Sequence, residues 1–350
     1  MKIGILTVHD SANFGSYLQA YALWKFLTEQ GYEVYFVRTR TRERVRQLYL
    51  GGKRNIIRYL SQYSYNIKKY NIMIPEINGF PEIALCDVEK VALDLVIIGS
   101  DELWNVNTPI FRNEYFYGIG VGAKRKITYA ISCGSATLDK MKEYPQLVEG
   151  MKQLDVVMVR DELTFGNVKN LIGILPEKVC DPTLLVDKKI FETVYDVPIK
   201  EKYILVYGYA WDKELIRFIK RYAKEKQLKI VSVCMHQKWC DENIMCTPLQ
   251  FGTLLKNAEC VVTATFHGSI FSVLNHTRFL VCSKLPKVKN ILEQMGVEER
   301  ILVSRDYKSF VQTLEKKIDY KVVDEKIEEL RRRSKKTFVG VLDSINATLY

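Results

Sequence analysis

The sequence has 350 residues, of which 47% are hydrophobic and 27% charged, with a formal net charge of +11. That length exceeds what one hydrophobic core usually supports, which predicts two domains. No segment approaches the roughly 18 to 20 uncharged apolar residues that a membrane helix needs. The N-terminus also lacks the apolar core and cleavage site of a signal peptide. These features exclude an integral membrane protein and predict a cytoplasmic one.

Strands and helices are expected to alternate in the first half of the chain. Residues 2–8 form an apolar strand, residues 16–30 carry apolar side chains at helical spacing up to Gly31, and a second strand follows. This strand–helix–strand unit predicts a parallel sheet with a right-handed crossover. Four further strands are predicted at residues 93–99, 127–134, 155–160 and 177–186.

A second alternating series follows a charged linker at residues 197–202. Five strands alternate there with helices predicted at residues 212–227, 248–257, 267–274, 286–295 and 307–318. The fold class is therefore α/β, with two Rossmann-like domains in a GT-B-like arrangement and ligands at the carboxyl ends of the strands. The predicted parts are an N-terminal domain (1–190), a C-terminal domain (191–322) and a helix (323–350) that crosses back to the first domain.

The eight cysteines are predicted to be structural, because none forms a CxxC pair and most lie in strand-like runs. The one metal-like grouping is Cys234, His236, Cys240 and Cys246, whose spacing fits no common zinc pattern. No metal is therefore expected.

Residues 38–69 contain ten Lys or Arg residues and a single acidic residue, Glu43. Such a segment could bind a nucleic acid, or an anionic membrane or lipid-linked phosphate. The third alternative is a solvent-exposed helical segment that binds nothing. Transient contact with the inner face of the membrane is the binding role favoured here, and nucleic acid is the least expected partner.

The segment 259–275, ECVVTATFHGSIFSVLN, is the most informative for chemistry. A strand is predicted to end near Thr265 and a helix to begin near Gly268, which places His267 at a helix N-terminus that favours anions. Gly268 would let a ligand approach the backbone. Hydroxyl groups surround the same point, from Thr263, Thr265 and Ser269. A purely structural histidine is the alternative.

Arg160 lies where another strand gives way to a helix. A guanidinium group matches a carboxylate or phosphate in shape and charge, so Arg160 is a candidate anion clamp in the interdomain cleft. The alternative is a surface ion pair with Asp161 or Glu162.

Two further segments suit a sugar. Ser100 and Asp101 form a turn at a strand end, and Trp104 offers a flat face for stacking. The other candidates open the first helix: Asn13, Gly15 and Gln19.

Five segments in this order, NFGSYLQAYAL, VIIGSDELWN, VRDELT, CDPTLL and TFHGSIFS, resemble the polysaccharide pyruvyl transferase family. The resemblance spans about residues 2 to 305. It implies phosphoenolpyruvate as donor, a hydroxyl pair of a cell-surface or exopolysaccharide precursor as acceptor, a ketal product and no cofactor. A lipid-linked saccharide would be a suitable acceptor. The N-terminal domain would then hold the acceptor and the C-terminal domain the donor.

The resemblance also assigns site residues. The catalytic pair would be His267 and Arg160. The other site residues are predicted from the local sequence and not from the resemblance: the donor would be bound by Thr263, Thr265, Gly268 and Ser269, and the acceptor by Asn13, Gly15, Gln19, Ser100, Asp101 and Trp104.

One position departs from the family pattern, because characterised members carry an arginine where this chain has Thr265. The change would weaken donor binding, move the task to another basic residue, or mark a different substrate. Two rival functions stay open: a nucleotide-sugar glycosyltransferase of the same architecture, and a non-catalytic binding protein.

Overall fold

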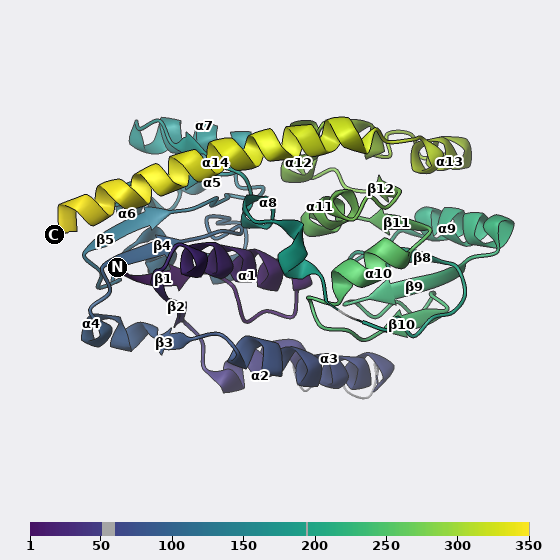
Figure 1. Ribbon diagram of the computed structural model, residues 1–350, viewed down its shortest axis with the longest axis horizontal. Coiled ribbons are helices and arrows are strands. Elements are labelled where there is room, and N and C mark those ends of the chain that lie inside the picture. The colour runs from purple at the N-terminus through teal and green to yellow at the C-terminus, as the bar shows by residue number, and fades with distance from the viewer. Residues whose placement is uncertain (51–59, 194, 350) are drawn as a thin grey trace.

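The computed structural model describes residues 1–50, 60–193 and 195–349, which form two parallel five-stranded sheets (Figure 1). The first sheet has the order β3-β2-β1-β4-β5 and the second the order β10-β9-β8-β11-β12. The first comprises β1 (Lys2–Leu6), β2 (Glu33–Arg38), β3 (Glu82–Ala84), β4 (Leu95–Ile98) and β5 (Arg125–Thr128). The second comprises β8 (Tyr203–Tyr207), β9 (Lys229–Val233), β10 (Glu242–Ile244), β11 (Cys260–Thr263) and β12 (Phe279–Val281). A short pair, β6 (Met158–Val159) and β7 (Glu177–Lys178), lies between them in sequence.

The central strands are continuous apolar runs, as expected where helices cover both faces of a parallel sheet. β4 and β8 are buried along their whole length, and so is β11. In the first sheet Ile3 pairs with Val34 on one side and Leu95 on the other. In the second, Leu205 pairs with Val231 and Val261.

The helices cover the faces and ends of these sheets. The α-helices are α1 (Phe14–Glu29), α2 (Arg42–Leu50), α3 (Leu60–Asn78), α4 (Val88–Val91), α5 (Leu138–Lys142), α6 (Pro145–Met151), α7 (Glu162–Ile172), α8 (Pro182–Leu185), α9 (Lys213–Lys226), α10 (Phe251–Asn257), α11 (Phe266–Leu274), α12 (Pro286–Met295), α13 (Tyr307–Glu315) and α14 (Tyr320–Leu349). The 3-10 helices are η2 (Leu85–Asp87), η3 (Pro109–Phe111), η4 (Glu114–Tyr117), η5 (Lys188–Phe191) and η6 (Glu298–Arg300). None of the helices in the described part of the chain has the length and apolar character needed to cross a bilayer.

The strand predicted over residues 177–186 is wrong in its second half. β7 ends at Lys178, and Pro182–Leu185 form helix α8. The Asp181 side chain accepts a hydrogen bond from the Thr183 backbone N–H at 3.0 Å, which caps this helix, and Pro182 occupies its first position. Proline suits the first turn of a helix because its missing N–H would have had no partner there.

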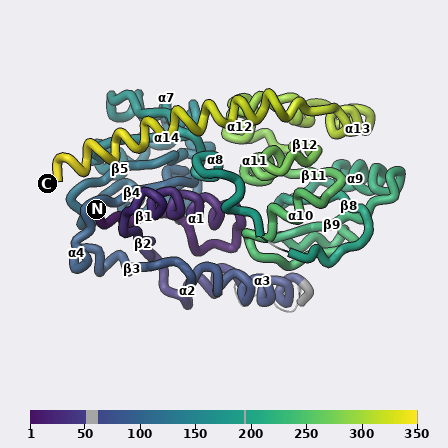
Figure 2. Tube along the Cα trace, viewed as in Figure 1, coloured from purple at the N-terminus to yellow at the C-terminus, as the bar shows by residue number. Residues whose placement is uncertain are grey.

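Helix α14 confirms the predicted return to the first domain. It runs from α13 beside the second sheet to the far end of the first sheet (Figures 1 and 2). Phe338 of α14 packs on Phe26 and Tyr129, with ring centroids 5.4 Å and 4.2 Å apart. The Ser334 hydroxyl also accepts a hydrogen bond from the Cys180 backbone N–H at 2.8 Å.

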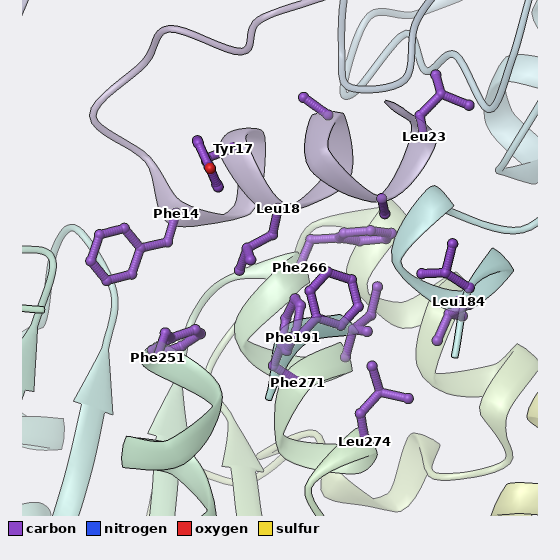
Figure 3. Packing of buried hydrophobic residues seen from close by; sticks show 14 of the residues in the cluster. Phe14, Tyr17, Leu18, Leu23, Leu184, Phe191, Phe251, Phe266, Phe271 and Leu274 are labelled. Carbon is purple, nitrogen blue, oxygen red and sulfur yellow. The ribbon is translucent and has the colours of Figure 1, made fainter. Parts of the chain in front are cut away.

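Apolar side chains join the two halves into a shared core. Figure 3 shows Phe14 and Leu18 of α1 on one side and Phe251 and Phe271 of α10 and α11 on the other. The rings of Phe14 and Phe251 meet edge to face at 5.7 Å. Helix α1 also packs on α11. Because α1 follows β1 and α11 follows β11, this packing brings the carboxyl ends of the two sheets together.

Candidate active site between the two sheets

A cavity of about 340 Å³ lies between the carboxyl ends of the two sheets. It is lined by Asn13, Ser16, Asp101, Glu102, Phe111, Arg160, Tyr207, Tyr209, Ala264, Thr265, Phe266, His267, Leu285 and Lys287. A larger hollow of about 630 Å³ lies beside α10 and α11, but neither His267 nor Arg160 lines it. The smaller cavity is the candidate site because both His267 and Arg160 line it, together with other ionisable side chains.

His267 lies in the first turn of α11, close to where the sequence places it. The Thr265 side chain caps this helix by accepting from the Gly268 backbone N–H at 3.0 Å. The imidazole packs directly on α1, where a Cβ atom at Gly15 would lie 2.2 Å from Nδ1 of His267. Gly15 therefore has to be a glycine if His267 is to occupy this position.

Three of the predicted donor-binding residues stabilise the turn between β11 and α11 and do not line the cavity. Thr263 is fully buried and donates its hydroxyl to the Tyr207 carbonyl at 2.9 Å. Ser269 is also fully buried and donates to the Thr265 carbonyl at 2.9 Å. A Cβ atom at Gly268 would lie 2.2 Å from the Thr263 hydroxyl, so this glycine makes room for the turn and not for a ligand.

Arg160 and His267 share one carboxylate, that of Asp181. Arg160 Nη1 donates to Asp181 Oδ2 at 2.7 Å, and His267 Nε2 lies 3.6 Å from Asp181 Oδ1. The Thr183 hydroxyl donates to the same Oδ1 at 2.6 Å. Arg160 is only 4% exposed, and its guanidinium lies 4.5 Å from the centre of the Phe266 ring. The alternative of a surface pair with Asp161 or Glu162 is therefore wrong.

The electrostatics keep Asp181 ionised. Burial by itself would raise the pKa of this carboxyl, but His267, Arg160 and the Thr183 hydroxyl outweigh burial and hold the pKa below its ordinary value. Arg160 Nε and Nη2 and His267 Nε2 are buried without a hydrogen-bond partner among the described residues. Buried donors without hydrogen-bond partners are costly, so an anion that reached these nitrogens would relieve that cost.

Two carboxylates and a lysine complete the cavity. Asp101 Oδ2 accepts from the Ser16 hydroxyl at 2.8 Å, and its Oδ1 lies 3.9 Å from Arg160 Nη2. Glu102 forms an ion pair with Lys287, which comes from the start of α12. Burial lowers the pKa of the Lys287 ammonium, against the opposing effect of Asp101.

Asn13 links the two domains at the edge of the cavity. Its Oδ1 accepts from the Gly15 backbone N–H at 3.0 Å and from the Tyr207 hydroxyl at 3.2 Å. Asn13 therefore caps α1 and also contacts the last residue of β8.

Four residues predicted to bind the acceptor do not line this cavity, and one of them is Gly15, which lies against the His267 ring. Trp104 is fully buried, donates its Nε1–H to the Phe116 carbonyl at 2.9 Å and stacks on Tyr117, so it cannot offer a face to a sugar. Gln19 is also fully buried and donates to the Thr7 hydroxyl at 3.1 Å. Ser100 is buried behind Arg160, whose Nη1 donates to its hydroxyl at 3.4 Å.

Four residues of this site were not assigned a role from the sequence. Asp181 belongs to the segment CDPTLL, for which the sequence predicts a strand, so the direction of its side chain is not predicted. Glu102 adjoins Asp101, but Lys287 stands 20 residues after His267 and no motif marks it. Tyr209 is 66% exposed on the cavity wall and offers the flat face that Trp104 does not.

The metal-like grouping around Cys234 is not gathered into a site. No cluster of three or more His, Cys, Asp or Glu side chains in the described ranges could hold a metal ion. The Cys234 sulfur lies 3.1 Å from Lys69 Nζ, which comes from α3. Cofactor independence stays a prediction.

Comparison with known proteins identifies the family. The model of the polysaccharide pyruvyl transferase family matches residues 13–283. This chain belongs to that family. No curated protein matches the sequence.

Solved structures share the architecture of this pyruvyl transferase family member. UDP-GlcNAc 2-epimerase from Neisseria meningitidis, bound to UDP-GlcNAc, aligns with a TM-score of 0.56 at 13% identity, covering 98% of this chain and 100% of that one. α,α-Trehalose 6-phosphate synthase from Burkholderia multivorans aligns with a TM-score of 0.55 at 11% identity, covering 99% and 97%. UDP-GlcNAc 2-epimerase from Methanocaldococcus jannaschii aligns with a TM-score of 0.51 at 14% identity, covering 94% and 99%. These similarities confirm the GT-B-like fold. At such low identity they say nothing about the activity of this chain.

At the position where the resemblance implies an arginine, this pyruvyl transferase family member uses Thr265 to cap α11. The cavity contains two other cations, because Arg160 and Lys287 both line it. Their guanidinium and ammonium groups lie 4.5 Å and 5.7 Å from the centre of the Phe266 ring.

Proposed function

We propose that this protein transfers pyruvate from phosphoenolpyruvate onto two hydroxyl groups of a saccharide and forms a cyclic ketal. One observation carries the proposal. The buried nitrogens of Arg160 and His267 that lack hydrogen-bond partners belong to residues that line a single interdomain cavity, in a chain of the polysaccharide pyruvyl transferase family. They offer cationic and hydrogen-bonding groups to a small anion, and an imidazole is the side chain that most often serves as a general acid or base.

The donor carries a carboxylate and a phosphate, and the cavity has a group for each. The planar fork of Arg160 suits bidentate pairing with either anion. Lys287 supplies a compact second charge. The N-terminus of α11 adds backbone N–H groups and the positive end of the helix dipole. Both anions would thus be neutralised without the arginine that the family pattern places at residue 265.

His267 is proposed to carry the protons. Protonation of the donor's methylene carbon by the imidazolium leaves an oxocarbenium-like centre at C2, which one sugar hydroxyl attacks. The neutral imidazole takes the proton of that hydroxyl. Phosphate then departs as the neighbouring hydroxyl closes the ring, and the phosphate carries away the proton of this second hydroxyl. Asp181 would hold the ring in place and stabilise its charged form throughout, because it stays ionised.

The acceptor is proposed to be a precursor of a cell-surface polysaccharide or exopolysaccharide, carried on a lipid. Asp101 and Asn13 present oxygen atoms to its hydroxyls on the side of the first domain. Contact with an anionic membrane through residues 38–69 is part of the same proposal. Residues 51–59 of that segment lie outside the described residues. Of the rest, Arg40 pairs with Asp10 and Arg42 with Glu82, whereas Arg44 and Arg46 are exposed.

Thermal-shift titration tests the donor first. Phosphoenolpyruvate should raise the melting temperature, and pyruvate should raise it less because it lacks the phosphate. A rise with UDP alone would favour a nucleotide-sugar glycosyltransferase, and no rise with any of the three would favour a binding protein.

Turnover is then measured as phosphate release from phosphoenolpyruvate. The acceptors are methyl and 4-nitrophenyl hexosides that present a 4,6-hydroxyl pair, and the ketal is detected by mass spectrometry. Donor binding without a ketal product across such a panel and across lipid-linked hexosides would reject the proposed reaction.

A further inference from the structure

Glu102 and Lys287 form an ion pair across the cavity, from different domains. Glu102 follows the turn at the end of β4, and Lys287 lies at the start of α12. Their side chains are 19% and 15% exposed, so both charges are largely removed from water. Lys287 also lies 5.7 Å from the centre of the Phe266 ring, next to the Arg160 guanidinium on the same ring.

The carboxylate of this pair is held in place, whereas the lysine can move. Glu102 Oε2 accepts from Asn105 Nδ2 at 2.8 Å. Gly134, at φ +60°, lies against the same oxygen, because a Cβ atom there would be 2.3 Å from Oε2. Lys287 has only its flexible four-carbon stem to reposition. An incoming anion is therefore expected to draw Lys287 away from Glu102 and not the reverse.

We propose that Glu102 masks Lys287 in the empty site, and that the anionic donor takes over Lys287 and uncovers Glu102 as a binding group for the acceptor hydroxyls. The inference rests on the proposed function and assigns Glu102 a role in it. A partly buried carboxylate that loses its cation needs new hydrogen-bond donors, and sugar hydroxyls supply them. Donor would therefore bind before acceptor.

A double-mutant cycle on donor affinity tests the masking and needs no acceptor. Isothermal titration with phosphoenolpyruvate compares the natural chain with Glu102→Gln, Lys287→Met and the double variant. Glu102→Gln frees the lysine, so the donor should bind about twofold to fivefold more tightly, as for release of a partly exposed ion pair. Lys287→Met should weaken binding, and adding Glu102→Gln to it should change nothing further.

The outcomes separate masking from a general charge effect. Equal tightening by Glu102→Gln with and without Lys287 would mean that the carboxylate only repels the donor, and would overturn the proposal. So would an unchanged affinity in Glu102→Gln. If neither the natural chain nor Glu102→Gln binds phosphoenolpyruvate, the proposed function itself fails. The melting temperature of each variant without ligand shows whether the fold is kept.

A kinetic measurement tests the acceptor half. With the hexoside that turns over, Glu102→Gln should raise KM for the acceptor while the donor binds more tightly. Initial rates of the natural chain should follow an ordered pattern with the donor first. An unchanged acceptor KM in Glu102→Gln, or random order in the natural chain, would overturn this half.

Discussion

The turns after β4 and after β11 occupy equivalent positions, because each follows the fourth strand of a sheet with the same order. Both open into the same cavity. After β4 the chain makes a turn in which Asp101 has a left-handed φ of +82° and Glu102 follows. After β11 the chain enters α11 within three residues and presents His267 in its first turn.

The comparison indicates that the strand order determines where the site forms, whereas the residues of each turn determine the charge that the turn presents to the cavity. The β4 turn presents two carboxylates, which accept hydrogen bonds from hydroxyls. The β11 turn presents a histidine and the N-terminus of a helix, which favours an anion. Arg160 breaks this division, because it comes from the first domain and binds Asp181 beside His267. A donor anion would therefore contact both domains at once.

Removing the histidine of the β11 turn should have the largest effect. His267→Ala is expected to lower kcat about 10²- to 10⁴-fold, as for loss of a general acid–base group. Donor affinity should largely remain, because Arg160 and Lys287 are untouched. Phosphate release and titration with phosphoenolpyruvate measure the two effects. His276→Ala, at an exposed histidine that pairs with Asp324, is the matched control and should be fully active. An active His267→Ala variant would mean that this turn only binds.

Arg160→Met tests the residue that crosses the division. It should weaken donor binding and also lower the free energy of unfolding by roughly 3–5 kcal/mol, because Asp181 stays buried without its main ion-pair partner. Urea unfolding measures the stability. Arg305→Met breaks the exposed pair with Asp212 and is expected to cost at most about 1 kcal/mol. If the two variants lost the same unfolding free energy, burial would not be what makes the Arg160–Asp181 pair strong.

The stability of the same pair should depend on pH in a defined direction. The pKa of Asp181 is lower in the folded than in the unfolded chain, where it is about 3.9. Its ionised form therefore stabilises the fold above about pH 4, and this stabilisation is lost as the pH falls further through the folded-state pKa. In Arg160→Met the pKa of Asp181 should rise, so that protonation relieves the unpaired charge. The difference in unfolding free energy between the two proteins should thus shrink from pH 7 to pH 4. A constant difference would contradict this origin.

Changing the cap of the β11 turn should have the smallest effect. Thr265→Ala removes the hydrogen bond to the Gly268 backbone N–H and should cost about 1 kcal/mol of unfolding free energy. Thr265→Ser keeps a hydroxyl and should restore most of that loss. A drop in donor affinity in Thr265→Ala with no loss of stability would instead mean that this hydroxyl contacts the donor.

Much of the fold could be predicted because its signals are local. The apolar runs of β1 and β8 and the amphipathic pattern of residues 286–295 each specify one element, and α12 has those bounds. The second half of residues 177–186 was misassigned because an apolar run next to a proline can form a strand or a capped turn of helix. His267 and Arg160 each follow a parallel strand, and parallel strands carry their ligands at the carboxyl ends, so both residues could be expected at the cavity between the domains.

The rest of the site depends on contacts between distant segments. Trp104 looks like a sugar platform in its own segment, and only the packing of Phe116 and Tyr117 over it removes it from the surface. Lys287 reaches the cavity because α12 packs beside α11, a position that no local pattern encodes. The need for glycine at residue 15 is also evident only in three dimensions, because a side chain at Gly15 would clash with the His267 ring.

The path of α14 has a consequence for synthesis on the ribosome. Phe338 covers Phe26 and Tyr129, which belong to the part of the chain made first. Until Phe338 has emerged from the ribosome, the first domain has an open apolar face that a chaperone or another nascent chain can bind. Translation that stalls before residue 338 would therefore leave an aggregation-prone product, although every residue of the candidate site would already have been made.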